Sequence, residues 1–270
     1  MSMRCLNLGC GQRFHPEWVN LDLHPWNPSV RVCDLRKDLP FSEGSFDAVY
    51  HSHVLEHFSR ADGSRFLGEC HRVLRPGGII RVAVPDLEKI ARLYIEALDR
   101  SLAGDSTWQS RYEWILLEMY DQTVRRASGG EMLSYLSREP VPERDFIARR
   151  LGGEFDRIVA HVARSTDDEP RKSALSLRQR ISRKLAELAL GREGLEAHDR
   201  GIFQLSGENH LWMYDRYSLA QALEKSGFTS PRSLGAAESA IPDWTKFNLD
   251  TEPDGRIYKP DSLFMEATRA

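Results

Sequence analysis

The first 85 residues contain short apolar segments separated by turn signals. Five segments are rich in Val, Leu and Ile and predict strands: RCLNL (4–8), WVNLDL (18–23), VRVCDL (30–35), FDAVYH (46–51) and IIRVAV (79–84). Between the last two, apolar side chains recur at helical spacing, and Pro76-Gly77-Gly78 end that helix. Nearly continuous apolar strands with a helix between them predict a parallel sheet covered on both faces.

From about residue 87 to residue 200 the apolar spacing changes to three and four residues, which is typical of amphipathic helices. This spacing runs through LEKIARLYIEAL, RYEWILLEMYDQTV, FDRIVAHVA and LRQRISRKLAELAL. After Gly201 the α/β pattern returns with a predicted helix, RYSLAQALEKSGF, and the strand candidates SPRSL and SLFMEA. We predict one α/β domain, residues 1–90 and 201–270, interrupted by a helical insertion at 91–200.

Composition and charge narrow the class of protein. With 270 residues, 41% hydrophobic and 29% charged, the chain can bury a sizeable core. A net charge of −3 gives no global attraction to nucleic acid or membranes, and no apolar run approaches the roughly 18 residues of a membrane span. The N-terminus lacks the order of a signal peptide, and the four cysteines form no C-x-x-C pair. These features predict a cytoplasmic protein with reduced thiols.

The turn LNLGCG follows the first predicted strand and raises the question of a nucleotide site. A dinucleotide fingerprint needs a third glycine, but position 14 is Phe, and the acidic Asp22 comes only eleven residues after Gly11. A smaller ligand suits the turn better, because Gly9 and Gly11 let the backbone approach it closely. At the ends of the next two strands, Asp22 can accept hydrogen bonds from ribose hydroxyls and Asp34 from an adenine amino group. Alternatively, either aspartate caps a turn.

These motifs in this order resemble class I S-adenosylmethionine-dependent methyltransferases of the methyltransferase type 11 group. The resemblance rests on LNLGCG (6–11), Asp22, Asp34, SFDAVYHSHVLEH (45–57) and LRPGG (74–78). It implies a Rossmann-like sheet, mostly parallel with an antiparallel last strand, and S-adenosyl-L-methionine as cofactor with S-adenosyl-L-homocysteine as product. The cofactor-binding residues it implies are Gly9, Cys10, Gly11, Asp22, Leu23, Asp34, Leu35, His51 and Ser52.

The string HSHVLEHF (51–58) contains H-x-x-E-H, the ligand pattern of some zinc peptidases. In the methyltransferase fold it lies instead after the fourth strand, with His53, Glu56 and His57 on a short helix beside the cofactor. We disfavour the hypothesis of a zinc peptidase because it explains neither the glycine turn nor Asp22 and Asp34. Some class I methyltransferases bind a divalent ion at this place, so a metal-assisted O-methyltransferase using His53, Glu56 and His57 is an alternative. We predict no metal, with these residues hydrogen-bonded around the substrate mouth.

The chemistry of the acceptor is less constrained by the sequence. Topology brings His57, Asp86 and His210 to the binding face as candidate catalytic residues, although Asp86 is equally suited to cap a helix and His210 to pack in a core. Arg256 and Lys259 are candidates for binding a phosphate or carboxylate of the acceptor, and a solvated loop is the alternative. We predict O-methylation of a small-molecule or glycan/lipid-linked acceptor under a helical lid. A non-catalytic S-adenosylmethionine-binding protein is the other alternative. The basic stretch 171–192 is a candidate for peripheral membrane contact.

Overall fold

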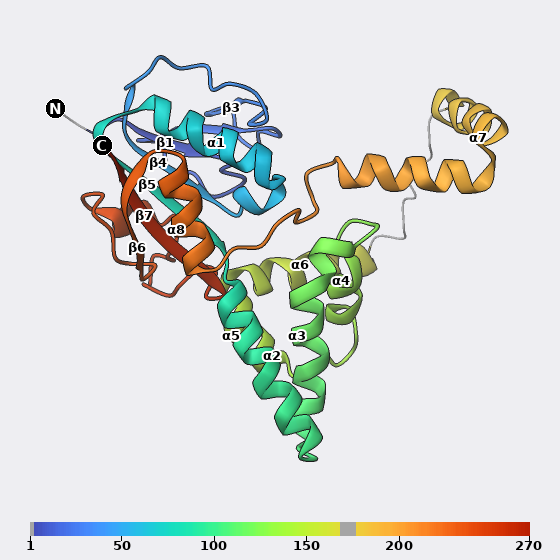
Figure 1. Cartoon of the computed structure of the whole chain (residues 1–270). Coiled ribbons are helices and arrows are strands. Elements are labelled where there is room, and N and C mark those ends of the chain that lie inside the picture. The colour runs from blue at the N-terminus through green and yellow to red at the C-terminus, as the bar shows by residue number, and fades with distance from the viewer. Residues whose placement is uncertain (1–2, 168–176) are drawn as a thin grey trace.

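A seven-stranded sheet forms the centre of the protein, which we describe from a computed structural model covering residues 3–167 and 177–270 (Figure 1). The strand order is β3-β2-β1-β4-β5-β7-β6, and β7 alone runs antiparallel to its neighbours. The strands are β1 (Cys5–Leu8), β2 (Val19–Asp22), β3 (Val30–Val32), β4 (Phe46–Ser52), β5 (Leu74–Pro85), β6 (Phe228–Leu234) and β7 (Ser262–Arg269). The predicted Rossmann-like sheet with an antiparallel last strand is confirmed.

The two faces of the sheet are covered in different ways. On one face, α1 (Arg60–Val73) and α8 (Arg216–Lys225) pack on the strands, with Phe66 and Leu219 in the largest apolar core. On the other face, Trp18 and Tyr50 pack with Trp244 of η2 (Trp244–Phe247). Among the described residues, no α-helix contributes to this second core, and the 236–250 segment, which includes η2, covers the face.

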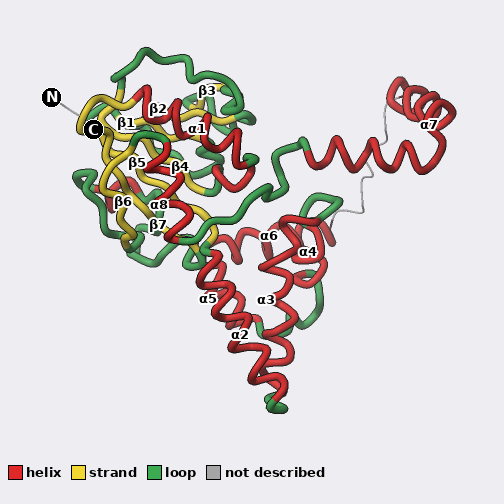
Figure 2. The backbone as a smooth tube through the Cα atoms, in the orientation of Figure 1, coloured by secondary structure: helices red, strands yellow, loops and turns green. Residues whose placement is uncertain are grey.

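The described residues between β5 and α8 form helices joined by turns and loops, and none of these described residues belongs to a strand (Figure 2). The helices are α2 (Leu87–Leu102), α3 (Ser106–Val124), α4 (Gly130–Leu136), α5 (Arg144–Leu151), α6 (Gly153–Asp167) and α7 (Leu177–Gln204). Helices α3 to α6 form a core of their own around Trp114, Tyr135 and Ile147. This part of the chain therefore folds around its own apolar cluster rather than extending the sheet core.

The helical insertion leaves and rejoins the sheet at one point. Asp86, the last residue before α2, forms a parallel bridge with Tyr214, and the Leu87 N–H donates to the Tyr214 carbonyl at 3.0 Å. A second attachment lies between α5 and α6, where the Gly153 N–H donates to the Tyr258 carbonyl at 2.9 Å. These attachments place α6 beside the 250–260 segment.

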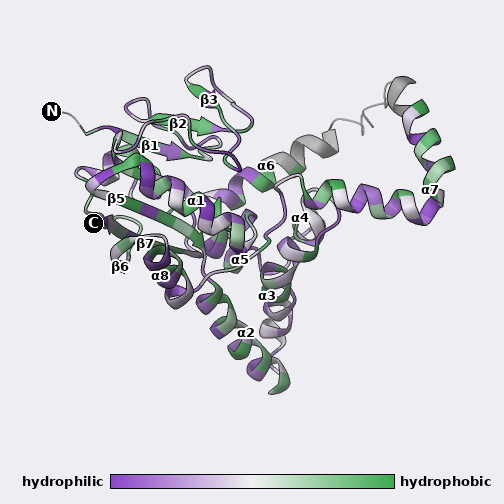
Figure 3. Ribbon diagram, turned by 45° about the horizontal axis from the view of Figure 1, so that its top comes forward, coloured by the Kyte–Doolittle hydropathy of each residue, from purple (hydrophilic) through white to green (hydrophobic). Residues whose placement is uncertain are grey.

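Helix α7 lies apart from the sheet and from α2–α6 in two views (Figures 1 and 3). Several of its apolar side chains, including Leu185 and Leu188, are exposed, although Leu195 is buried, and Arg183 pairs with Asp199 at 2.7 Å. Part of the basic stretch proposed for membrane contact, 171–176, lies outside the described residues, and that contact stays a prediction. None of the helices in the described ranges is long and apolar enough to cross a membrane.

Candidate active site

The turn after β1 depends on two glycines, Gly9 and Gly11, that have positive φ angles. Gly9 has a φ of +63°, and a Cβ there would lie 2.4 Å from Cγ2 of Val54, so any side chain would clash. Gly11 has a φ of +51° and open space on its Cβ side. The turn is fixed to β2 by the Cys10 N–H, which donates to the Leu21 carbonyl at 3.1 Å. The backbone is thus tightly packed behind Gly9 and accessible at Gly11, as a ligand-binding turn requires.

Asp22 joins the glycine turn to the end of β2. Its two carboxylate oxygens accept the N–H groups of Gly11 and His24, each at 2.8 Å. Asp34, one strand further, instead binds the guanidinium of Arg36 at 2.9 and 3.2 Å, and this contact lowers the pKa of Asp34. Asp22 therefore lies at the turn as proposed, whereas Asp34 accepts hydrogen bonds from a neighbouring side chain.

A cavity of about 150 Å³ opens between the turn and the end of β4. Its lining includes Gly9, Cys10, Gly11 and Ser52 of the proposed cofactor residues. The proposed residues Asp22, Leu23, Asp34 and Leu35 do not line this cavity, and Leu35 packs against the sheet core.

The His51 side chain points away from the cavity. It is fully buried, its ring packs against Phe66 with centroids 5.1 Å apart, and burial lowers its pKa to about 4. A contribution of His51 to the ligand would therefore come from its backbone alone.

Side chains from distant parts of the chain complete this cavity. The Arg13 guanidinium stacks on the Tyr258 ring at 3.9 Å and pairs with Glu252 at 3.2 Å. From α6, Arg157 donates to the Tyr258 hydroxyl, and Glu154 pairs with Lys259 at 3.0 Å. Glu154, Arg157, Tyr258 and Lys259 all line the cavity. The sequence carried no motif for Arg13, Glu154 or Arg157, because their roles depend on contacts between segments far apart in the chain.

A second cavity, of about 320 Å³, lies on the other side of His53, Glu154 and Lys259, which line both. Its remaining lining comes from the sheet edge and from α3 to α6: His57, Pro85, Gln122, Arg125, Gly129, Met132, Leu133, Leu136, Leu151, Ile158, His210 and Asp261. The insertion thus supplies most of the apolar lining together with Gln122, Arg125 and Glu154. The core supplies three histidines, Lys259 and Asp261.

His53 lies at the junction of the two cavities. Its φ is +53°, its N–H donates to the Ala83 carbonyl at 2.9 Å, and its Nε2 lies 2.9 Å from the Ser262 hydroxyl. The expectation that His53 lies on the following helix was wrong, because the short helix η1 spans only Leu55–His57. His53 and His57 therefore do not share a helix face, which removes the geometric basis of the peptidase reading.

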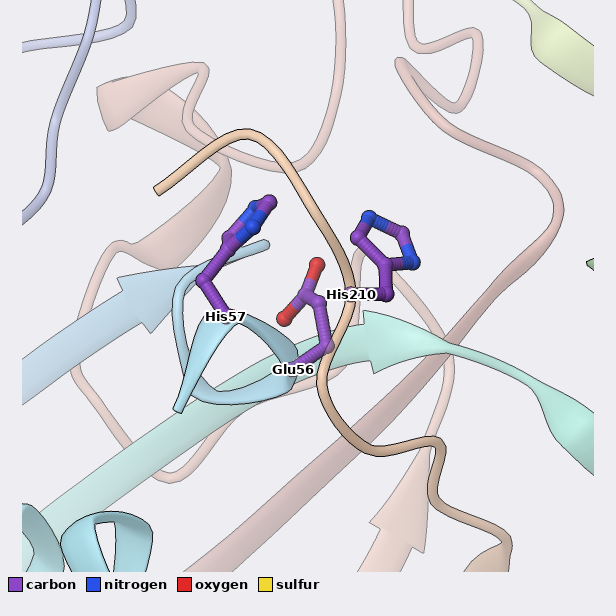
Figure 4. Close-up of side chains that lie close together, drawn as sticks. All are labelled: Glu56, His57 and His210. Carbon is purple, nitrogen blue, oxygen red and sulfur yellow. The ribbon is translucent and has the colours of Figure 1, made fainter. Parts of the chain in front are cut away.

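Glu56, His57 and His210 lie close together (Figure 4), and the two histidines line the second cavity. One potential ligand atom from each residue lies within 4.8 Å of the other two. The two imidazole rings meet edge to face with centroids 4.9 Å apart. Burial lowers the pKa of His210 to about 3, so its imidazole is neutral at physiological pH.

Asp86 has the alternative role of a helix cap. Its carboxylate accepts the Lys89 N–H at 3.1 Å at the start of α2, and it lines neither of the two cavities described above. Of the three candidate catalytic residues, the structure brings His57 and His210 together and leaves Asp86 elsewhere.

Comparison with known proteins places this geometry in a family. Residues 10–82, from the glycine turn into β5, match the family model of a methyltransferase domain. The chain is 44% identical over 58 residues to an uncharacterized methyltransferase of Synechocystis sp., a match that covers 22% of this chain and 26% of that protein. The chain therefore contains a class I S-adenosylmethionine-dependent methyltransferase domain. Both the predicted family and its cofactor, S-adenosylmethionine, are confirmed for this methyltransferase domain.

A second relative supports the same domain. A probable S-adenosylmethionine-dependent methyltransferase of Mycolicibacterium smegmatis is 43% identical over 49 residues, which is 18% of each chain. The matches span only 26% and 18% of the two relatives' lengths. A solved structure from Thermotoga maritima, a possible histamine N-methyltransferase, is 13% identical with a TM-score of 0.37, over 100% of this chain and 84% of that one. A likeness of that size says nothing about the acceptor of this methyltransferase.

Proposed function

We propose that this chain transfers a methyl group from S-adenosylmethionine to an oxygen atom of an acceptor held in the second cavity. The observation that carries the proposal is the shared lining of the two cavities by His53, Glu154 and Lys259. A donor at the glycine turn and an acceptor under the insertion would meet at this junction. Such alignment of two reactants is the main catalytic contribution of a protein to a displacement reaction.

The turn fits the proposed cofactor. Gly11 offers open space over its backbone, and the Asp22 carboxylate beside it keeps lone pairs beyond the two that accept N–H groups. Gly9, Cys10, Gly11 and Ser52 would hold the donor at the ends of β1 and β4. When bound, S-adenosylmethionine supplies a methyl group activated on a sulfonium sulfur.

The two walls of the second cavity indicate the class of acceptor. Met132, Leu136 and Ile158 contribute apolar lining from the insertion, while His57, His210 and Asp261 contribute polar groups from the core. An acceptor with an apolar body and a hydroxyl group fits this division. A small molecule or a lipid-linked glycan has that character.

An acceptor hydroxyl must lose its proton when its oxygen is methylated. Nδ1 of His57 lies 3.1 Å from the Asn209 carbonyl, and a carbonyl only accepts, so Nδ1 carries the hydrogen. Nε2 then keeps a lone pair, and His57 lines the cavity. In the metal-free protein, His57 would take the proton from the acceptor hydroxyl at this atom.

Calorimetric titration of S-adenosylmethionine into the chelator-dialysed protein tests the cofactor site. We expect wild type to bind and Asp22→Ala to bind about ten- to a hundredfold more weakly, because a hydrogen bond to a charged group contributes about 1.5–3 kcal/mol. Asp38→Ala, at an exposed aspartate, is the matched control and should bind like wild type. Folded wild type that binds no cofactor, or equal binding by Asp22→Ala, would refute the assignment.

Turnover separates an enzyme from a binding protein. We expect conversion of S-adenosylmethionine to S-adenosylhomocysteine when hydroxyl-bearing metabolites with apolar groups are added. Binding without conversion across such a library would support the alternative of a non-catalytic cofactor-binding protein.

A further inference from the structure

The Glu56 carboxylate is buried without a hydrogen-bond donor. Its side chain is 0% exposed, and neither oxygen accepts a hydrogen bond from the described residues. Nδ1 of His53 lies 3.2 Å from Oε1, within ion-pair distance but without hydrogen-bond geometry. A buried carboxylate in this condition is costly unless a cation or a proton accompanies it.

Two imidazoles flank this carboxylate, one from η1 and one from the segment that follows α7 (Figure 4). The Asn209 carbonyl fixes the tautomer of His57 and leaves Nε2 with its lone pair. A backbone carbonyl on the far nitrogen is the usual support of a metal-binding histidine. His210 is held by its N–H, which donates to the Gln122 carbonyl at 2.9 Å.

Backbone contacts fix the two segments to each other. The Glu56 carbonyl accepts the N–H groups of Leu211 and Trp212 at 2.7 and 3.2 Å. Residues 56–57 and 209–212 therefore form one unit, although about 150 residues separate them in the chain. The three side chains converge because of this pairing, and not because of a chance approach of mobile groups.

We propose that Glu56, His57 and His210 bind a divalent transition-metal ion, with Zn²⁺ the best match. Two imidazole nitrogens and one carboxylate oxygen suit Zn²⁺, Mn²⁺ or Fe²⁺, whereas Mg²⁺ and Ca²⁺ prefer oxygen ligands throughout. The ligand atoms all lie within 4.8 Å of one another, so small side-chain movements would bring them around one ion. His53 would act as a positioning residue that orients Glu56.

The site would open toward the acceptor. Three protein ligands leave a coordination position free, and His57 and His210 both line the second cavity. This inference rests on the proposed function and deepens it: the ion would bind the acceptor oxygen and favour loss of its proton to water. With the ion bound, His57 would be a ligand, and the ion would replace it in promoting deprotonation.

Titration of Co²⁺ into the chelator-stripped full chain tests the site independently of activity. Co²⁺ reports its coordination by visible absorption, and Zn²⁺ should displace it. We expect one equivalent per chain, with affinity lowered about a hundredfold or more in His210→Ala and in Glu56→Gln. His198→Ala, which removes a half-exposed histidine on α7, is the matched control and should bind like wild type.

The outcomes separate this inference from the proposed function. No stoichiometric Co²⁺ binding by wild type, or unchanged binding by folded His210→Ala, would overturn the metal site. His210→Ala keeps the test valid if Glu56→Gln does not fold, since His210 lies on a connecting segment. S-adenosylmethionine binding in the stripped protein reports on the cofactor site alone. Metal binding without cofactor binding would therefore refute the proposed function and leave the metal site standing.

Discussion

Gly152, between α5 and α6, is a position where a single added methyl group should displace the helical insertion from the core. Its φ is +58°, and a Cβ there would lie 2.5 Å from the Tyr258 carbonyl oxygen and 2.6 Å from Cδ of Pro260. Real Cβ atoms essentially never approach closer than 3.0 Å. In Gly152→Ala the insertion must therefore move away from the 257–260 segment.

The magnitude has two parts. A residue other than glycine at a positive φ, here φ +58° with ψ −134°, costs about 1–3 kcal/mol. Overpacking against rigid backbone adds about 1–3 kcal/mol. Gly104→Ala shares only the first part, since Gly104 has a φ of +87° with nothing within 4 Å of its Cβ position. The difference between the two variants should be about 2 kcal/mol, or about 4–8 °C in Tm for a protein of this size.

Thermal unfolding followed by circular dichroism measures this difference, and calorimetry with S-adenosylmethionine measures its functional effect. Because Tyr258 and Lys259 line the cavity that we propose for the cofactor, Gly152→Ala should also weaken cofactor binding, whereas Gly104→Ala should not. Equal Tm values for the two variants would show that the close approach is not present in solution. Unchanged cofactor affinity in Gly152→Ala would show that the insertion does not shape the cavity.

Two further predictions concern buried groups. The folded-state pKa of His51 is about 4, below its ordinary value of 6.5, so between these two pH values the unfolded chain binds more protons than the folded chain. The free energy of unfolding should therefore fall by up to about 3 kcal/mol as the pH drops through this window. His51→Phe should remove that part of the slope in denaturant titrations at pH 7 and pH 5, and an unchanged slope would contradict the burial. Among the cysteines, Cys5, Cys10 and Cys70 are buried, and burial raises the pKa of Cys10 to about 12. A thiol reagent should therefore modify only the half-buried Cys33 quickly. Cys33→Ser should abolish the fast phase, and fast modification of a second thiol would refute the packing.

The sequence was informative wherever the physical cause is local. Apolar runs predicted each strand of the sheet, because alternation and turn residues act over a few positions. The positive φ of Gly9 and Gly11 follows from the same short-range logic. The boundary of β5 was less visible, because LRPGG was interpreted as a helix end. The structure includes it in a strand that starts at Leu74, with an irregular register between Phe46 and Ala48 of β4.

The rest depends on contacts that no local pattern encodes. Arg157 reaches the cofactor cavity only because Gly152 and Gly153 bring α6 against Tyr258. Likewise, His210 meets Glu56 through backbone bonds at Leu211. The left-handed conformation of His53 also went undetected, since histidine gives no signal for it. Contacts between segments that are distant in the chain depend on the folded structure, so the spacing of residue types along the sequence does not predict them.

The joint between Asp86 and Tyr214 has a consequence for how such proteins diversify. The chain leaves the sheet at Leu87 and returns at Tyr214, and a backbone hydrogen bond joins these two residues. The structure of the sheet therefore does not depend on the length of the segment between them. The entropic cost of a closed loop grows only slowly with its length, by about 0.6 kcal/mol per doubling. The segment between the two strands could therefore change in length without rebuilding the sheet. Such a change would have to keep the second attachment at Gly152 and Gly153, through which the insertion reaches the cavity at the glycine turn.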